Sequence, residues 1–277
     1  MGTVRGMEIK GTTTLLTGAT GGIGSAIARR LAAEGSTLIL TDLDQASLDT
    51  LAGSLPGEGH VGIAADLSSR KVCDTLVAQA EELGGPVDIL INNAGTERTA
   101  VFHELDPDAL DKILKVNLRA PMLLTRAAIP GMLERGRGHV VLMASTAGLA
   151  GPACLEPYAA GKAGLVRFAE SLRGTYRNAP LGFSAVCPGF TKGGGMFTRM
   201  RAKGNKPSPL LGSTTVDDVA ATVSRAITED LPLVVSNSQP VRPLTLLTTA
   251  TPRLAARAME LSGANRFFRA DAANRFD

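Results

Sequence analysis

The sequence lacks most features that mark secreted, membrane or nucleic-acid-binding proteins. Its 277 residues include three cysteines, Cys73, Cys154 and Cys187, which lie far apart without CxxC spacing. Neither a disulfide framework nor a metal site is predicted, and reduced thiols suit an intracellular protein. Its 29 basic and 26 acidic residues leave a net charge of +3, which is too small for a nucleic-acid footprint.

Targeting and membrane-spanning segments are also missing from the pattern. Residues 1–10 have no apolar core of the kind found in secretory signals. The longest run without charge, residues 139–155, is interrupted by polar residues, glycines and a proline, so a buried strand and loop are expected there rather than a membrane span. We therefore expect a cytoplasmic protein.

Short β-branched runs alternate with amphipathic stretches along most of the chain. This alternation predicts right-handed crossovers and an α/β fold: one doubly wound parallel sheet of Rossmann type, with helices on both faces. The apolar fraction of 44% supports a sizeable core, and we expect a single domain over residues 1–277. The predicted strands are 13–17, 37–41, 61–65, 87–91, 139–144, 182–187 and 231–236, and the predicted helices are 23–34, 44–55, 68–83, 107–134, 157–178 and 215–229.

Two segments do not follow this alternation of strands and helices. Residues 189–212 carry five basic and no acidic side chains between apolar ones, which suits either a lid over a lipophilic or anionic substrate or a solvated loop. Residues 237–277 form a C-terminal extension with a basic amphipathic stretch at 252–261, in which Arg253 and Arg257 share a face. That stretch could rest on an anionic membrane surface, but packing on the domain or on a partner subunit is favoured. The basic residues of the lid are Lys192, Arg199, Arg201, Lys203 and Lys206.

The first predicted strand runs into a glycine-rich turn, TGATGGIG at residues 17–24, which opens a helix. Gly18 permits the tight turn, Gly22 lets the backbone approach a pyrophosphate, and Gly24 allows close packing of helix on strand. Asp42 ends the next strand, where a carboxylate binds both adenine-ribose hydroxyls and repels a 2′-phosphate. The pattern therefore predicts NAD rather than NADP, although Asp42 could instead cap the following helix.

A serine, a tyrosine and a lysine follow the fifth strand. Ser145 comes directly after it, and Tyr158 precedes Lys162 by four residues on a predicted helix, so that the two side chains share one face. An ordinary tyrosine, with a pKa near 10, is a poor base at neutral pH. A neighbouring cation, together with a positive nicotinamide, is expected to lower the pKa of Tyr158 toward the working range.

In order and spacing these motifs resemble the short-chain dehydrogenase/reductase family, in its Tyr-x3-Lys form, over about residues 10–235. Asn92-Asn93-Ala94-Gly95, Asn117 and Pro188-Gly189 complete the pattern. The resemblance implies that Tyr158 exchanges a proton with the substrate oxygen, Ser145 hydrogen-bonds that oxygen, and Lys162 binds the nicotinamide ribose. Asn117 would position a water molecule in a proton relay. The cofactor site so implied comprises Gly18, Thr20, Gly21, Gly22, Ile23, Gly24, Asp42, Asp66, Leu67, Asn93, Ala94, Gly95, Tyr158, Lys162, Pro188, Gly189 and Thr191.

One position departs from the family pattern. Gly193, in a run of three glycines, stands where the family often has Thr or Ser. We expect an NAD-dependent dehydrogenase that interconverts a secondary alcohol and a ketone, with a lipophilic substrate and a homodimer built on the long helices. The alternatives are an NADP-linked carbonyl or ketoacyl reductase and a non-catalytic NAD-binding regulatory protein.

Overall fold

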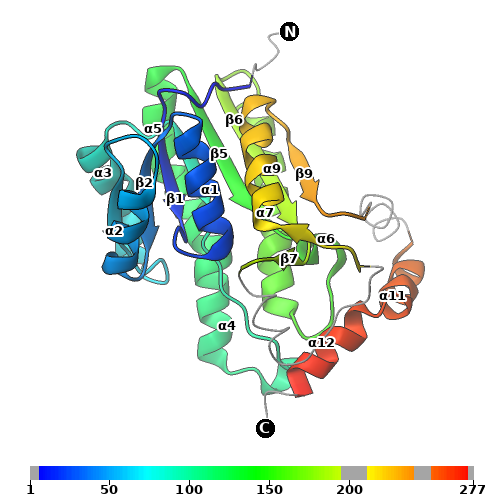
Figure 1. The fold of residues 1–277 in the computed structure, drawn as a ribbon. Helices are drawn as coiled ribbons and strands as arrows, with labels where there is room; N and C mark the ends of the chain where they lie inside the picture. Colours follow the sequence, from blue (N-terminus) through cyan, green and yellow to red (C-terminus); the bar gives the residue numbers. More distant parts are fainter. Residues whose placement is uncertain (1–5, 195–210, 240–250, 274–277) are drawn as a thin grey trace.

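A seven-stranded parallel sheet forms the centre of the molecule (Figure 1). The computed structural model describes residues 6–194, 211–239 and 251–273. The strand order is β3-β2-β1-β4-β5-β6-β9, so the direction of connection reverses between β1 and β4, where parallel sheets bind their ligands. The strands are β1 (Thr13–Thr17), β2 (Thr37–Asp42), β3 (Val61–Ala64), β4 (Ile89–Asn92), β5 (Gly138–Met143), β6 (Leu181–Pro188) and β9 (Leu233–Ser236).

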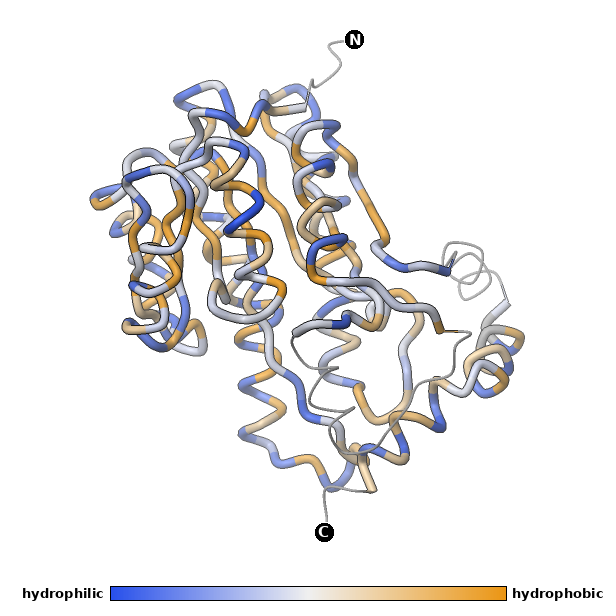
Figure 2. Tube along the Cα trace, in the orientation of Figure 1, coloured by the Kyte–Doolittle hydropathy of each residue, from blue (hydrophilic) through white to orange (hydrophobic). Residues whose placement is uncertain are grey.

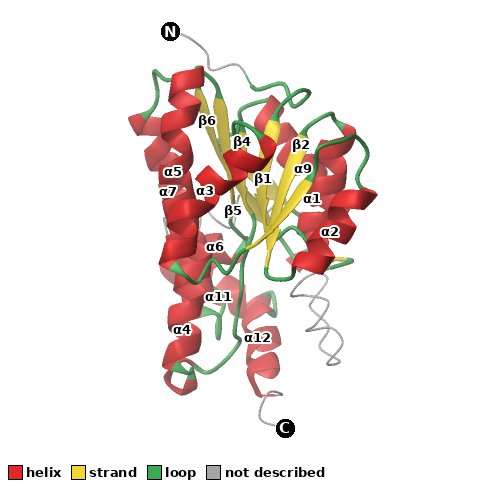
Figure 3. Ribbon diagram, turned by 90° about the vertical axis from the view of Figure 1, so that its left-hand side faces the viewer, coloured by secondary structure: helices red, strands yellow, loops and turns green. Residues whose placement is uncertain are grey.

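Helices cover both faces of this sheet (Figure 3). One face packs against α1 (Gly22–Ala33), α2 (Gln45–Ser54) and α9 (Val216–Thr228), and the other against α3 (Arg70–Gly84), α5 (Ala120–Arg135) and α7 (Glu156–Thr175). Hydrophobic residues concentrate on the strands between these layers (Figure 2). The predicted doubly wound α/β fold is therefore confirmed.

The helix predicted over residues 107–134 is present as one continuous helical run, 107–135, but a π-helical turn lies within it. The segment is α4 (Pro107–Leu114), a π-helical turn η2 (Lys115–Arg119) and then α5. Pro121 follows this turn and has no N–H to donate to the carbonyl four residues earlier, which belongs to Asn117. π-turns of this kind are frequent at functional sites.

Several short elements were not predicted from the sequence. β7 (Thr191–Lys192) pairs in parallel with β8 (Thr214–Thr215), so a small sheet joins the start of the 189–212 segment to the residues that follow its end. Within that segment, residues 195–210 lie outside the described residues, and with them Arg199, Arg201, Lys203 and Lys206. The remaining unpredicted elements are η1 (Phe102–Glu104), α6 (Ala147–Ala150) and α12 (Ala264–Ala273).

The C-terminal extension is helical where it is described. α11 (Pro252–Leu261) coincides with the amphipathic stretch seen in the sequence, and its Arg253 and Arg257 are exposed. α12 packs against the domain through Phe267 and Phe268. No helix in the described ranges has the length and apolar character to cross a bilayer.

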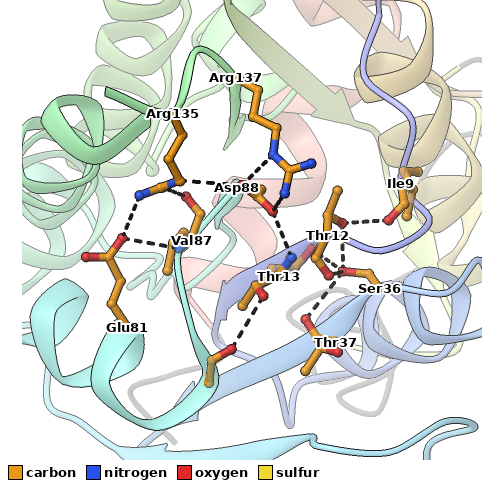
Figure 4. Close-up of polar contacts among 12 residues, drawn as sticks. Ile9, Thr12, Thr13, Ser36, Thr37, Glu81, Val87, Asp88, Arg135 and Arg137 are labelled. Atoms are coloured by element: carbon orange, nitrogen blue, oxygen red, sulfur yellow. Dashed lines mark hydrogen bonds and ion pairs between the residues drawn. The ribbon is translucent and has the colours of Figure 1, made fainter. Parts of the chain in front are cut away.

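A buried carboxylate organises the amino-terminal edge of the sheet, opposite to the ends where ligands bind (Figure 4). Asp88 is 2% exposed; its oxygens accept two hydrogen bonds from Arg137, at 3.0 and 2.8 Å, and one from the Thr13 backbone N–H at 3.3 Å. Such a charge is stable inside a protein only when it is paired in this way. The contact joins β1, β4 and β5 at their starts, which leaves the opposite edge free for loops.

Candidate active site

A cleft of about 690 Å³ opens at the carboxyl ends of the strands, at the point where the strand order reverses. All but one of the residues predicted for the site line it; the exception is Asn117, which lies behind the wall and is fully buried. Predicted residues as far apart in the sequence as Gly18 and Thr191 therefore share one cavity. The predicted residues on its wall are Gly18, Thr20, Gly21, Gly22, Ile23, Gly24, Asp42, Asp66, Leu67, Asn93, Ala94, Gly95, Ser145, Tyr158, Lys162, Pro188, Gly189 and Thr191.

The glycine loop between β1 and α1 has the form of an anion cradle. Gly18 has φ +65°, a conformation that side chains disfavour. A Cβ atom at Gly24 would lie 2.0 Å from the carbonyl oxygen of Gly18, so only glycine permits this packing. The first turn of α1 begins at Gly21 without a side-chain cap, which leaves its N–H groups available to a phosphate. The residues present therefore fit a dinucleotide.

Asp42 faces this loop from the end of β2. Its Oδ2 accepts a hydrogen bond from the Thr20 hydroxyl at 2.6 Å and another from the Thr20 N–H at 3.0 Å. The cap of α2 is Asp44, whose carboxylate accepts from the Ser47 N–H at 2.8 Å. The alternative in which Asp42 caps that helix is therefore wrong, and its carboxylate is held toward the cleft.

The loop after β4 supports the glycine turn from the other side. The amide nitrogen of Asn93 donates to the carbonyl oxygens of Thr17 and Gly18 at 3.0 and 2.9 Å. The Thr17 hydroxyl in turn accepts from the backbone N–H groups of Asn93 and Ala94. These bonds fix the spacing between the two loops, and Asn93, Ala94 and Gly95 still line the cleft. At the same edge, hydrogen bonds from Ser68 lower the pKa of Asp66.

Tyr158 and Lys162 lie on the same face of α7, in the predicted manner, with the Lys162 Nζ 5.7 Å from the centroid of the Tyr158 ring. Both are buried, with 9% and 4% exposure. The Lys162 ammonium donates to the carbonyl oxygen of Met143, at the end of β5, at 2.7 Å. Ser145, two residues further on, hydrogen-bonds the phenol of Tyr158. One hydroxyl, one phenol and one ammonium thus meet at one end of the cleft.

Burial, rather than the neighbouring cation, controls the acidity of the phenol in this structure. Desolvation raises the pKa of Tyr158 to about 12, and the Ser145 hydrogen bond opposes this only in part. Desolvation also lowers the pKa of Lys162 to about 8. The expected lowering of the Tyr158 pKa is therefore not found in this structure, because removing a phenolate from water costs more than the hydrogen bond returns.

Asn117 reaches the site from behind, at the π-turn. Its side-chain amide nitrogen donates to the carbonyl of Thr96 at 2.7 Å, and its Oδ1 accepts from the Thr96 N–H at 2.9 Å. Gly95 lies between this amide and Lys162: a Cβ atom there would be 3.3 Å from the Asn117 Oδ1 and 3.4 Å from the Lys162 Nζ. The absence of a side chain at Gly95 is what lets these polar groups approach each other.

β6 ends at Pro188, and both Pro188 and the following Gly189 lie at the wall of the cleft. The Thr191 hydroxyl donates to the Gly189 carbonyl at 3.1 Å. Gly193 has φ +88°, which explains the departure from the family's Thr or Ser, because that conformation suits glycine. Asn237, just after β9, packs against Gly189 and donates to the Leu211 carbonyl at 3.2 Å.

Some wall residues were missed by sequence reasoning. Thr96 directly follows Gly95, and Val116 directly precedes Asn117. Because they are next to predicted site residues, they could have been predicted to line the cleft. The residues from the C-terminal extension had no such signal, since an amphipathic pattern does not reveal what its apolar face contacts. The additional wall residues include Thr96, Lys112, Val116, Pro152, Leu155, Phe190, Met259, Ser262, Ala264 and Phe268.

The sequence of this chain is similar to those of many known proteins. The model of the family described as short chain dehydrogenase matches residues 12–205. The "Ketoacyl reductase HetN" of a Nostoc species is 36% identical over 235 residues, which is 84% of this chain and 81% of that protein. The "D-beta-hydroxybutyrate dehydrogenase" of Cupriavidus necator is 34% identical over 184 residues, 66% of this chain and 71% of that protein.

The fold is also similar to that of a solved structure. The 3-ketoacyl-(acyl-carrier-protein) reductase from Brucella melitensis, complexed with NADH, superposes with a TM-score of 0.74 at 27% identity. The match covers 82% of this chain and 97% of that one. Nearly all of the smaller protein therefore has a counterpart here, whereas part of this chain has none there.

Proposed function

The chain belongs to the short-chain dehydrogenase family of oxidoreductases, and from this premise we propose that it interconverts a secondary alcohol and a ketone with NAD. One observation carries the proposal: Ser145, Tyr158 and Lys162 meet at one end of a single cleft, and the glycine loop lies on the wall of the same cleft. Proton transfer to a substrate oxygen and binding of a dinucleotide can then take place side by side.

The three side chains have distinct proposed roles. In the oxidation direction Tyr158 takes the proton of the substrate hydroxyl, and in the reduction direction its phenol returns that proton to the carbonyl oxygen. Ser145 donates a hydrogen bond to the same oxygen, and Lys162 holds a positive charge beside the phenol. A nicotinamide cofactor supplies the hydride chemistry, which none of these side chains has.

The proposed cofactor contacts follow from the shape of the cleft. The N–H groups at the start of α1 would bind the pyrophosphate, Asp42 the adenine ribose, and Lys162 the nicotinamide ribose. The choice of NAD rests on Asp42: its carboxylate accepts bonds from Thr20, so the Thr20 hydroxyl is directed to that acid and away from a 2′-phosphate.

Replacing Tyr158 by Phe tests the catalytic part of the proposal. We expect kcat for a secondary alcohol to fall by about 10² to 10⁴-fold, because general acid–base transfer contributes on that scale, while NADH binding is retained. Tyr176→Phe is the matched control, since Tyr176 is the second of the two tyrosines and packs on Phe183 at 5.6 Å. Full activity in Tyr158→Phe would refute the assignment.

Parallel fluorescence titrations with NADH and NADPH test the cofactor choice. We expect tighter binding of NADH. The similar proteins include two named as ketoacyl reductases, and these names favour a ketoacyl substrate for a second candidate, which in its NADP-linked form would bind NADPH more tightly than NADH. Tighter binding of NADPH would support that candidate and overturn ours.

We also propose a homodimer built on α5 and α7. Exposed apolar side chains on α5, Met122 and Leu133 at 36% and 40%, support a covered surface there. Light scattering after size-exclusion chromatography should give twice the 28.7 kDa chain mass, and a monomer at micromolar concentration would contradict this.

A further inference from the structure

The C-terminal extension forms part of the same cleft that contains the catalytic side chains. After β9 the chain continues into α11 and α12, which lie beyond the carboxyl ends of the strands, near α4 (Figures 1 and 3). Met259 of α11 and Phe268 of α12 are both on the cleft wall, at 7% and 6% exposure. Both residues are far in sequence from the predicted motifs, but they line the same cleft as Ser145, Tyr158 and Lys162.

Aromatic packing fixes α12 against the domain. The ring of Phe268 stacks on that of Phe190, with centroids 6.0 Å apart and planes at 22°. Phe267 meets both rings edge-on, at 5.5 and 5.1 Å. Offset-stacked and edge-to-face arrangements are the favourable geometries for aromatic pairs. Since Tyr158 belongs to the same cluster of buried residues, the position of Phe268 is defined relative to the phenol.

Polar contacts add to this attachment. The side-chain oxygen of Asn265, on α12, accepts a hydrogen bond from the Ala153 N–H at 3.0 Å. Glu260 of α11 accepts from Asn265 at 2.8 Å and from Arg269 at 2.7 and 3.1 Å. The two helices are therefore joined to each other and to the loop before α7, so they form a wall of fixed position.

We propose that α11 and α12 are the specificity wall of this enzyme, and that its substrates are secondary alcohols or ketones carrying a bulky, ring-containing apolar group. This inference rests on the proposed function and names the substrate class of that same site. The group would pack against Phe268 and Met259, with its oxygen at Tyr158. Leu155 and Phe190, also on the cleft wall, extend the apolar surface.

Two observations favour a bulky apolar group over a small or anionic one. The substrate end of the wall combines Leu155, Phe190, Met259 and Phe268, and such surfaces bind by burying apolar area. In addition, the shared fold accounts for 97% of the Brucella reductase but 82% of this chain. The family model itself ends at residue 205, so Met259 and Phe268 lie outside the part of the chain that it matches.

The test compares Phe268→Ala and Phe268→Leu with wild type, using 2-propanol and 1-indanol as alcohols with NAD. For Phe268→Ala we expect kcat/KM for 1-indanol to fall by about 10- to 100-fold, as for loss of a large apolar contact, and that for 2-propanol to change by less than about threefold. Phe268→Leu should keep most of the activity. Leu261→Ala, at a site that is 83% exposed on the same extension, is the matched control.

A binding measurement separates this inference from the proposed function. Calorimetry with 1-indanone and the protein loaded with NAD⁺, a pair that cannot react because both partners are oxidised, should show weaker binding to Phe268→Ala than to wild type. If Phe268→Ala bound 1-indanone more weakly than wild type but no alcohol was turned over, the proposed function would be refuted, and the inference that α11 and α12 form the specificity wall would stand. Three results would refute the specificity wall: equal turnover of 1-indanol by wild type and Phe268→Ala, an equal loss of activity toward both alcohols in Phe268→Ala, or a failure of wild type to bind 1-indanone.

Discussion

His139 on β5 is predicted to make the protein sensitive to mild acid. Its ring is 1% exposed, and its Nε2 bonds the Ser184 hydroxyl at 2.9 Å. That hydroxyl donates to the Leu231 carbonyl at 2.6 Å, so Nε2 carries the proton of the neutral ring. Burial lowers the pKa of His139 from 6.5 to about 4; Asp230 partly opposes this effect and Arg173 adds to it.

The sign and size of the effect follow from these values. Below pH 6.5 the unfolded chain takes up a proton at His139 that the folded chain refuses until about pH 4. The unfolded state therefore binds more protons, and the free energy of unfolding falls as the pH drops through this window. A pKa difference of this size corresponds to roughly 3 kcal/mol in total, of which about 2 kcal/mol is lost between pH 7.5 and pH 5.

Urea unfolding at pH 7.5 and pH 5 measures this loss for wild type and for His139→Gln. The variant is expected to be less stable at pH 7.5, because it disturbs a buried contact, but to lose about 2 kcal/mol less than wild type on acidification. His103→Gln is the control, since that side chain is 80% exposed. If His139→Gln lost as much stability as wild type, the assignment of a buried neutral His139 would be refuted.

Three further substitutions probe the cleft. Thr20→Val removes the 2.6 Å bond to Asp42 and should reduce the preference for NADH over NADPH by roughly fivefold, on the scale of one hydrogen bond; an unchanged ratio in fluorescence titrations would count against it. Gly95→Ala places a Cβ in tight contact with the Asn117 Oδ1, at 3.3 Å, and beside the Lys162 Nζ, at 3.4 Å, and should lower kcat by about tenfold through a shift of the Asn117 amide, whereas wild-type turnover would show that the site tolerates it. Gly24→Ala, with its Cβ 2.0 Å from a backbone oxygen, should cost about 3 kcal/mol in urea unfolding and abolish NADH binding; intact binding would contradict the packing argument.

The sheet and the glycine loop could be predicted because their signals are local. Strand and helix periodicity identifies the alternation, and the loop needs glycine at positions that a short stretch of sequence displays. Asp42 follows in the same way, as the acid at the end of the second strand. The π-turn could not be predicted in the same way, because Pro121 and Pro130 both lack a helical N–H, yet the helix changes its turn only before Pro121.

Other properties depend on contacts between distant segments. The spacing of Tyr158 and Lys162 correctly indicates a shared helix face, but the pKa of the phenol is set by how deeply the surrounding chain buries it. The sequence contains no measure of that depth. Likewise, the pattern around Phe268 indicates an amphipathic helix, yet only the folded chain reveals that its apolar face meets Phe190 and the cleft.

The position of the extension in the chain has a consequence for redesign. β9 completes the sheet at Ser236, so every strand and the glycine loop precede the segment that carries Met259 and Phe268. Recombination between relatives just after Asn237 would exchange the wall while retaining the hydrogen bond from Asn237 to Leu211. In evolution the same junction lets selection alter substrate range by acquiring, losing or replacing a tail, with the hydride-transfer machinery inherited unchanged.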